Sequence, residues 1–422
     1  MPDYKRKKVR KSLKPKRGKS KPSNDIIMQN TKKSNKNIVP ENNIKVVSGA
    51  KLKRKRNINI FISASALVCV ICIMLSLILP GGLYENIVNT VSIVGHGSYP
   101  VEITGSTVLN TVSNGSYYYV LSDTSISAYS NSGKQIFSEI HGFSNPIMSV
   151  SNTRALLFDQ GEKGLYVYNL TGKIHTLETE NEIINANISQ NGTFAVATQS
   201  NNYTSTVNVY NKNCKQIYTW NSAKDIVNNV LVNSNGNKIA VSTLSAVSGQ
   251  YESKVLILDF ESANALYTLD LGKSIVLSLE NTGRGLSVIT NDKYRFIHWS
   301  KFTTNEISAS GEINVLRKNS SGVLLVFNRA NDRSDNTVTL ISNKGTKVSE
   351  FKINNIITDI RYDKGRVYYI CDTVVNITDK NGEVLRNGSC DYGVECFSVI
   401  GSNSLAVITD SEIIKTEIEK GE

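Results

Sequence analysis

Charged side chains recur between the hydrophobic segments of this 422-residue sequence, at two alternating kinds of turn. One kind carries aspartate in five places, namely Asp123, Asp159, Asp292, Asp372 and Asp410. The other carries or adjoins lysine in six places, namely Lys134, Lys173, Lys215, Lys301, Lys344 and Lys380. Carboxylates on one surface could bind a basic partner or a cation, so the five aspartates are candidate binding residues. Aspartate is also an ordinary turn residue, and solvated turns without a ligand would give the same pattern.

Side-chain sets that are typical of catalysis are missing from the sequence. Asp332 and Asp335 are close in the chain, but they lack the alternating oxygen ligands of a calcium loop. There is no phosphate-binding loop, nucleophile elbow or zinc-protease motif. The four histidines are scattered without the spacing of metal ligands, at His96, His141, His175 and His298. We therefore expect no enzyme, no cofactor and no metal site, with a divergent enzyme that uses a central pocket as the alternative.

The elements that carry these residues are short strands, and they form a repeat. Turns of the Asn-Gly kind join strand pairs at intervals of 38 to 47 residues, from Asn114-Gly115 to Ser402-Asn403. A second kind of turn follows each of them by about 20 residues, as at Ser132-Gly133-Lys134. Such turns supply the positive φ that tight hairpins need. A period of about 40 residues with four strands in each unit predicts an all-β fold, a β-propeller.

The unit count predicts eight blades over residues 99–422. Seven units are complete, and an eighth begins at Cys396 but contains only about three strands before the chain ends. We expect Tyr99–Thr104 to supply the missing fourth strand; seven blades is the alternative. Strand direction then places the lysine turns on one face of the ring and the aspartate turns on the other. The chain before Tyr99 should arrive on the lysine side.

Two cysteines fall at one connection between units. Cys390 ends the seventh unit and Cys396 begins the eighth. Outside the cell they could form a disulfide, and two unbridged thiols are equally compatible with the sequence.

The net charge of +12 is concentrated at the N-terminus. Residues 1–56 hold 20 basic and three acidic residues, and their polar composition predicts a disordered tail. Asn57 to Tyr84 contains no charged residue, and Ile60–Leu79 is long enough to cross a bilayer as a helix. A cleaved signal peptide would have a shorter apolar region. We expect a signal-anchor at 57–80, a linker at 81–98 and, by the positive-inside rule, a cytoplasmic tail.

Several segments resemble a known family. They are the tail and anchor, Gly97-Ser98-Tyr99-Pro100-Val101, Val120–Thr124, and Ala195–Thr198 followed by Val207–Asn211. Over roughly residues 99–418 the chain resembles an uncharacterised family of bacterial membrane-anchored β-propellers, a domain of unknown function within the quinoprotein-like and WD40-like superfamily. The resemblance implies a location on the surface of a Gram-positive cell and supplies no activity.

These observations predict a single-pass protein of the cell membrane with an extracytoplasmic propeller. Its function is expected to be non-enzymatic, as a binding or scaffold module at the cell envelope. The expected partners are the anionic inner leaflet for the tail, and a protein or envelope polymer for the outer propeller face, with no nucleic acid. The alternatives are the divergent enzyme and a sensor that signals through the basic tail.

Overall fold

The computed structural model describes residues 49–78, 82–105, 107–247, 249–309, 311–319, 322–329, 332–390 and 393–419. The first 48 residues of the predicted tail lie outside the described residues. Two helices come first, α1 (Gly49–Ile78) and α2 (Gly82–Ile93). All the described side chains of α1 between residues 58 and 74 are exposed. Among the described residues, no helix is both long and apolar enough to cross a membrane.

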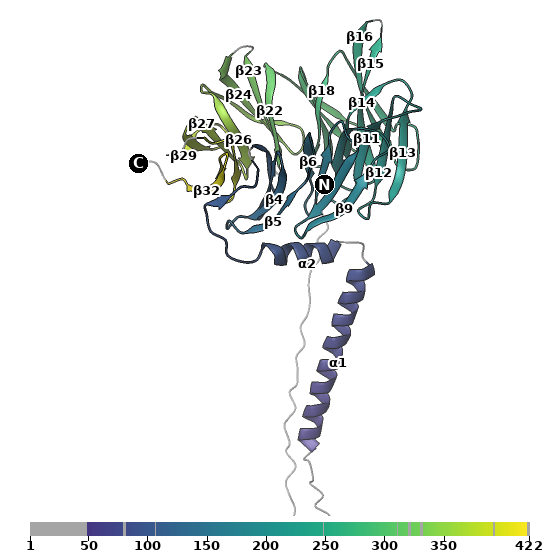
Figure 1. Ribbon diagram of the computed structural model, residues 1–422, viewed down its shortest axis with the longest axis vertical. Helices are drawn as coiled ribbons and strands as arrows, with labels where there is room; N and C mark the ends of the chain where they lie inside the picture. The colour runs from purple at the N-terminus through teal and green to yellow at the C-terminus, as the bar shows by residue number, and fades with distance from the viewer. Residues whose placement is uncertain are drawn as a thin grey trace, which may run out of the picture. The chain divides into compact units, whose positions relative to one another are not determined.

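The described chain from residue 101 to 417 forms eight four-stranded antiparallel sheets, the blades of a propeller (Figure 1). Blade 1 contains β2 (Val108–Ser113), β3 (Tyr117–Ser122), β4 (Ser125–Ser130) and β5 (Gln135–Ile140). Blade 2 contains β6 (Pro146–Val150), β7 (Ala155–Asp159), β8 (Gly164–Asn169) and β9 (Gly172–Glu178). Blade 3 contains β10 (Ile183–Ile188), β11 (Phe194–Gln199), β12 (Ser205–Tyr210) and β13 (Gln216–Ser222). Blade 4 contains β14 (Ile226–Val232), β15 (Lys238–Val247), β16 (Gln250–Asp259) and β17 (Tyr267–Gly272).

The second half of the ring repeats this order. Blade 5 contains β18 (Val276–Thr282), β19 (Gly285–Thr290), β20 (Lys293–His298) and β21 (Thr304–Ser308). Blade 6 contains β22 (Glu312–Asn319), β23 (Gly322–Arg329), β24 (Asp332–Ser342) and β25 (Lys347–Ile353). Blade 7 contains β26 (Ile357–Asp363), β27 (Arg366–Cys371), β28 (Val374–Thr378) and β29 (Val384–Ser389). Blade 8 contains β30 (Cys396–Val399), β31 (Ser404–Ile408), β32 (Glu412–Glu417) and, from the front of the chain, β1 (Val101–Glu102).

Blade 8 closes the ring with strands from both ends of the chain. Val101 of β1 pairs with Ile413 of β32, and the amide of Ile103 donates to the Ser411 carbonyl at 2.9 Å. This pairing confirms the predicted closure and eight blades rather than seven. A closed ring leaves no blade without a neighbour, which avoids the exposed sheet edges that promote aggregation.

The second strand of each blade is buried on both sides. All six residues of β3, with the sequence Tyr-Tyr-Tyr-Val-Leu-Ser, are buried, as are all six of β19. Such strands show no alternation of polar and apolar residues because a neighbouring blade covers each side. The packing between strands is tight at Gly285, where an added Cβ would lie 2.1 Å from the ring of Phe296.

Strand direction defines two faces of the ring. The lower face, which is lower in Figure 1, carries the turns between first and second strands and between third and fourth strands. The upper face carries the turns between second and third strands and the connections between blades. The lower-face turns are the predicted ones, and Gly115 and Gly133 have the expected positive φ of 74° and 82°.

Candidate binding faces

The five candidate aspartates all belong to upper-face turns, one each in blades 1, 2, 5, 7 and 8. The structure therefore distributes them around the ring instead of gathering them at one point. Asp292, Asp372 and Asp410 are exposed. These three carboxylates are available to a partner.

The other two candidate aspartates stabilise the propeller itself. Asp159 is only 5% exposed, and its carboxylate accepts hydrogen bonds from the amides of Ser144 at 3.0 Å and Asn145 at 2.7 Å. It thus fixes the connection that leads into blade 2. Asp123 is half-buried and accepts from the amide of Thr107 at 3.3 Å. The sequence pattern did not distinguish these two from exposed aspartates because their partners lie 14 to 16 residues away.

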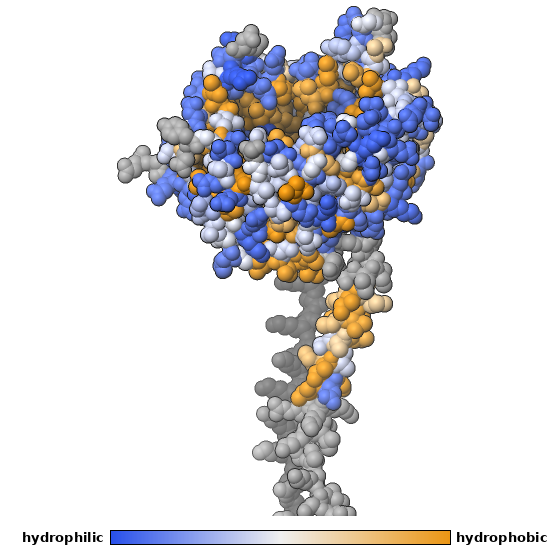
Figure 2. Space-filling model, viewed as in Figure 1, coloured by the Kyte–Doolittle hydropathy of each residue, from blue (hydrophilic) through white to orange (hydrophobic). Residues whose placement is uncertain are grey.

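The upper face also exposes apolar side chains that the sequence analysis did not single out. They lie within one residue of the start of an inner strand and are between 38% and 57% exposed: Leu109, Ile147, Ile226, Leu277 and Ile356. Leu109 and Leu277 each occupy a β-bulge, where the strand register shifts by one residue. Figure 2 shows apolar surface in the hollow of this face, between projecting hairpins. We call these five residues the apolar rim.

Two hairpins extend the upper face beyond the other turns (Figure 1). In blade 4, β15 and β16 are 10 residues each, and in blade 6, β24 is 11 residues. The lengthened strands carry polar side chains near their tips, where Ser245 pairs with Glu252. The upper face therefore combines the apolar rim, exposed carboxylates and two projecting hairpins.

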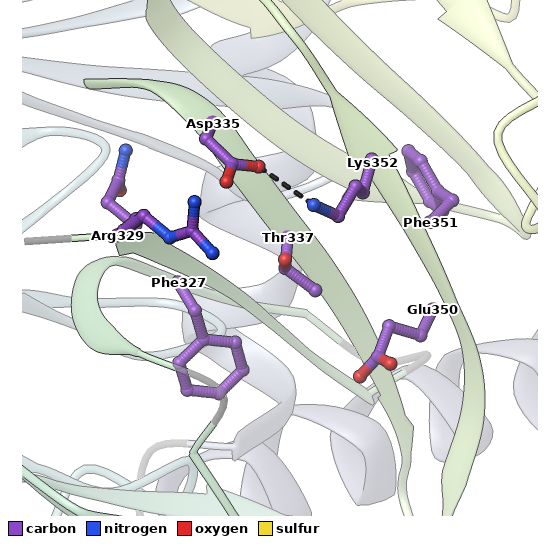
Figure 3. Close-up of a pocket in the computed structure, with 8 residues that line it drawn as sticks. Phe327, Arg329, Asp335, Thr337, Glu350, Phe351 and Lys352 are labelled. Carbon is purple, nitrogen blue, oxygen red and sulfur yellow. Dashed lines mark hydrogen bonds and ion pairs between the residues drawn. The ribbon is translucent and has the colours of Figure 1, made fainter. Parts of the chain in front are cut away.

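A pocket of about 400 Å³ opens on blade 6 (Figure 3). Its walls include Phe327, Arg329, Asp335, Glu350 and Lys352. Lys352 Nζ lies 3.0 Å from Asp335 Oδ1, and Glu350 accepts from Lys347 at 2.7 Å. The lysine hydrogen bond lowers the pKa of Glu350. Both carboxylates thus form ion pairs with lysines of the same blade.

Asp332 and Asp335, which are close in the sequence but lack the pattern of a calcium loop, make contacts within the protein. Asp332 Oδ1 accepts from the amide of Ser334 at 2.9 Å and from its hydroxyl at 2.6 Å, while Asp335 pairs with Lys352. Asn331, which precedes them, lies outside the described residues. Within the described ranges, no group of three or more His, Cys, Asp or Glu side chains could hold a metal ion.

A charge cluster around a buried carboxylate lies on the inner strands of blades 6 and 7. Asp359 is 2% exposed, and its Oδ1 lies 2.9 Å from Arg317 Nη2 and 2.6 Å from Arg361 Nη1. Burial lowers the pKa of Arg361, and the adjacent Asp359 opposes that shift. A buried carboxylate that is shared by two guanidinium groups is a strong structural contact, because an unpaired carboxylate at this site would be costly.

Of the two alternatives that the sequence left open for Cys390 and Cys396, the structure has the unbridged thiols. Cys390 packs with the cluster around Tyr368 and Phe397 between blades 7 and 8, and its thiol donates to the Thr373 carbonyl at 3.3 Å. Cys396 is a thiol that packs toward blade 1 instead. Burial, with Asp359 nearby, raises the pKa of Cys396 to about 11. Proximity in sequence therefore did not bring the two sulfurs together, because they enter different inter-blade layers.

The lower face carries the six predicted lysines, and five of them are exposed: Lys173, Lys215, Lys301, Lys344 and Lys380. Lys173 Nζ also lies 4.1 Å from the centre of the Tyr166 ring. Lys134 differs because it is engaged by α2. Its Nζ donates to the carbonyls of Ser92 at 2.8 Å and Val94 at 2.7 Å. A lysine at these positions satisfies carbonyls at the end of the helix and complements its dipole.

The segment that we expected to be a linker thus contains a docked helix. Near the start of α2, Glu85 forms an ion pair with Arg154, whose side chain is 6% exposed. In the middle, Asn89 is 5% exposed; it donates to the Thr153 carbonyl at 3.1 Å and accepts from the Leu170 amide at 3.3 Å. These contacts hold α2 on the lower face, the side on which the chain was expected to arrive.

Sequence comparison places this architecture in a family. Residues 95–418 match the family described as "Family of unknown function (DUF5711)". The chain belongs to this family. None of the curated proteins matches the chain.

Comparison with solved structures agrees with the propeller fold. The computationally designed Ika8 protein has a TM-score of 0.56 and 13% identity, over 77% of this chain and 100% of that one. The Dos1 propeller has a TM-score of 0.54 and 11% identity, over 78% and 97% of the two chains. The C-terminal WD40 domain of Sif2 has a TM-score of 0.53 and 13% identity, over 78% and 100%. At these identities the likeness concerns the fold alone.

Proposed function

We propose that this protein is a membrane-anchored, extracytoplasmic propeller that binds a partner through its upper face, without catalysing a reaction. The observation that carries the proposal is the difference between the two faces. The lower face holds α2. The upper face offers the apolar rim, the exposed Asp292, Asp372 and Asp410, and two raised hairpins.

The anchor is supported by the composition of α1. The sequence has no charged residue between Asn57 and Tyr84. Ten large apolar side chains of α1 are exposed between residues 58 and 74, from 47% to 80%. A helix that is apolar on all sides is stable only where something apolar surrounds it, such as lipid. The basic block Lys51–Arg56 in the first turns of α1 favours a cytoplasmic N-terminus, with the tail against the anionic inner leaflet rather than on nucleic acid.

The partner that best fits the upper face is a protein segment with both apolar and basic side chains. The apolar rim would bury its hydrophobic side chains, and the three exposed carboxylates would pair with basic ones. Charge complementarity of this kind steers association and selects among partners. An envelope polymer is the alternative partner, and the experiment below separates the two.

The experiment is photocrosslinking in intact cells from Leu277 on the rim, followed by mass spectrometry of the captured species. The triple variant Asp292→Lys, Asp372→Lys and Asp410→Lys should lose the capture. A matched triple variant of the lower face, with Lys215, Lys344 and Lys380 each changed to Glu, should retain it. Capture of polysaccharide instead of a protein would identify the envelope polymer as the partner. Loss of capture only in the lower-face variant would refute the assignment of the faces.

A further inference from the structure

Helix α2 presents an apolar stripe away from the propeller. Ile87 is 59% exposed, Val91 is 66% exposed and Val94 is 70% exposed. Ile87 and Val91 are four residues apart, so they share one side of the helix, and Val94 is the first residue after the helix end. Asn89, the buried residue that docks α2, lies on the opposite side. The helix thus contacts the propeller through Asn89 and Ile93 on its inner side and exposes Ile87 and Val91, beside the polar Thr90, on its outer side.

No described residue of the propeller covers this stripe, and the position of α2 in the chain indicates what could cover it. Only residues 79–81 separate the end of α1 from the start of α2. Three residues span about 10 Å at full extension, which keeps α2 close to the end of the apolar segment. If that segment crosses a bilayer, α2 begins at the level of the lipid head groups. An interfacial helix there would bury its apolar side in the upper part of the acyl chains.

The charges of the lower face fit the same surface. Five exposed lysines lie on the turns of this face, and basic residues close to an anionic bilayer are attracted to it. The attraction extends only about 8 Å at physiological ionic strength, so it acts once α2 has brought the face near the membrane. The apolar stripe would bind the bilayer, and the lysines would orient the lower face toward it.

We infer that the outer side of α2, with Ile87, Val91 and the adjoining Val94, lies in the lipid interface and holds the lower face of the propeller against the membrane. The inference rests on the proposed anchor. It adds that the propeller has a fixed orientation, with its upper face directed away from the bilayer.

Tryptophan quenching by brominated lipids tests this inference on the full chain in liposomes that contain anionic phosphatidylglycerol. The sequence has two tryptophans, so the wild-type protein supplies a low and constant background. The variants Ile87→Trp and Val91→Trp place a reporter on the stripe. The control Ile147→Trp places one on the upper face, at a side chain that is likewise exposed.

Lipids brominated near the head-group end of their acyl chains should remove most of the emission added at positions 87 and 91, and none of that added at 147. Equal quenching at 147, or none at 87 and 91, would overturn the inference. A blue-shifted but unquenched reporter at 87 would overturn it by showing that a protein, such as a second copy of the chain, covers the stripe. Flotation after alkaline extraction separates the two proposals. A protein that leaves the vesicles refutes the anchor and this inference together, whereas a retained protein with unquenched reporters refutes this inference alone.

Discussion

Arg361 donates a hydrogen bond from Nη2 to Oγ1 of Thr111 at 3.0 Å, although the two residues lie 250 positions apart in the chain. Arg361 belongs to the inner strand of blade 7 and Thr111 to the inner strand of blade 1. Between them stands blade 8, and the guanidinium carbon of Arg361 lies 5.6 Å from the centre of the Phe397 ring on its inner strand. One side chain thus joins three successive blades at the point where the ring closes.

The first prediction is that Arg361→Met destabilises the propeller by about 3 kcal/mol, because the buried Asp359 would lose the less exposed of its two guanidinium partners. Urea unfolding followed by circular dichroism measures the change. Thr111→Val should cost about 1 kcal/mol, the value of one lost hydrogen bond. The two effects should not add, since both variants remove the same contact. An unchanged unfolding midpoint in Arg361→Met would show that the contact does not stabilise the closure.

The second prediction concerns the pH dependence of Cys396. Its pKa of about 11 in the folded protein lies above the ordinary thiol value, so the folded state favours the protonated form. The stability that this shift contributes is present below about pH 9 and is lost as the pH rises toward about 11. Cys396→Ala should therefore reduce the loss of stability over that window, measured as thermal midpoint against pH. An identical alkaline profile in the variant would contradict the shift.

The raised pKa of Cys396 also predicts that its thiol reacts slowly with alkylating reagents. Two pKa units correspond to about a hundredfold less thiolate at pH 8 than in the unfolded chain. Alkylation of Cys396 by iodoacetamide should accordingly be much slower in the native protein than in urea, as measured by peptide mass spectrometry. Rapid native labelling at pH 8 would show that the thiolate is not disfavoured.

Much of this architecture could be predicted because it depends on local sequence patterns. The turn spacing defined the blades, and the incomplete eighth unit required a strand such as β1 from the front of the chain. Contacts between distant segments could not be predicted in this way. Asp159 has the same local pattern as the exposed Asp410, and only the connection from blade 1 distinguishes them. Helix α2 was overlooked because 12 residues next to glycines resemble a linker until buried partners such as Arg154 are known.

The third prediction uses a strained turn in blade 7. Lys364 has φ of 46° and the following Gly365 has φ of 81°, the pattern of a type I′ hairpin turn. A lysine in this conformation costs about 1 kcal/mol or more, whereas asparagine tolerates it. Lys364→Asn should therefore raise stability by about 0.5 kcal/mol, and its exposed contact with Asp363 at 3.9 Å contributes little to offset that gain. Lys344→Asn, in a turn where the lysine φ is not positive, is the matched control and should leave the thermal midpoint unchanged. A lower thermal midpoint for Lys364→Asn would mean that a contact of the lysine side chain stabilises the protein by more than its positive φ costs.

The last prediction concerns the docking of α2. Asn89 satisfies a carbonyl and an amide of blade 2 at once, and Asn89→Ala would leave both without that partner in a buried site. The expected loss of about 1–3 kcal/mol acts on a short helix, which has little stability without tertiary contacts. Amide hydrogen exchange over residues 82–93 should therefore accelerate about tenfold, while exchange in the second strands of the blades stays unchanged. Thr90→Ala, on the exposed side of the same helix, is the control and should leave the exchange rates as they are. If Asn89→Ala also left them unchanged, the remaining contacts of Glu85 with Arg154 and of Lys134 with the end of the helix would be sufficient to hold α2 in place.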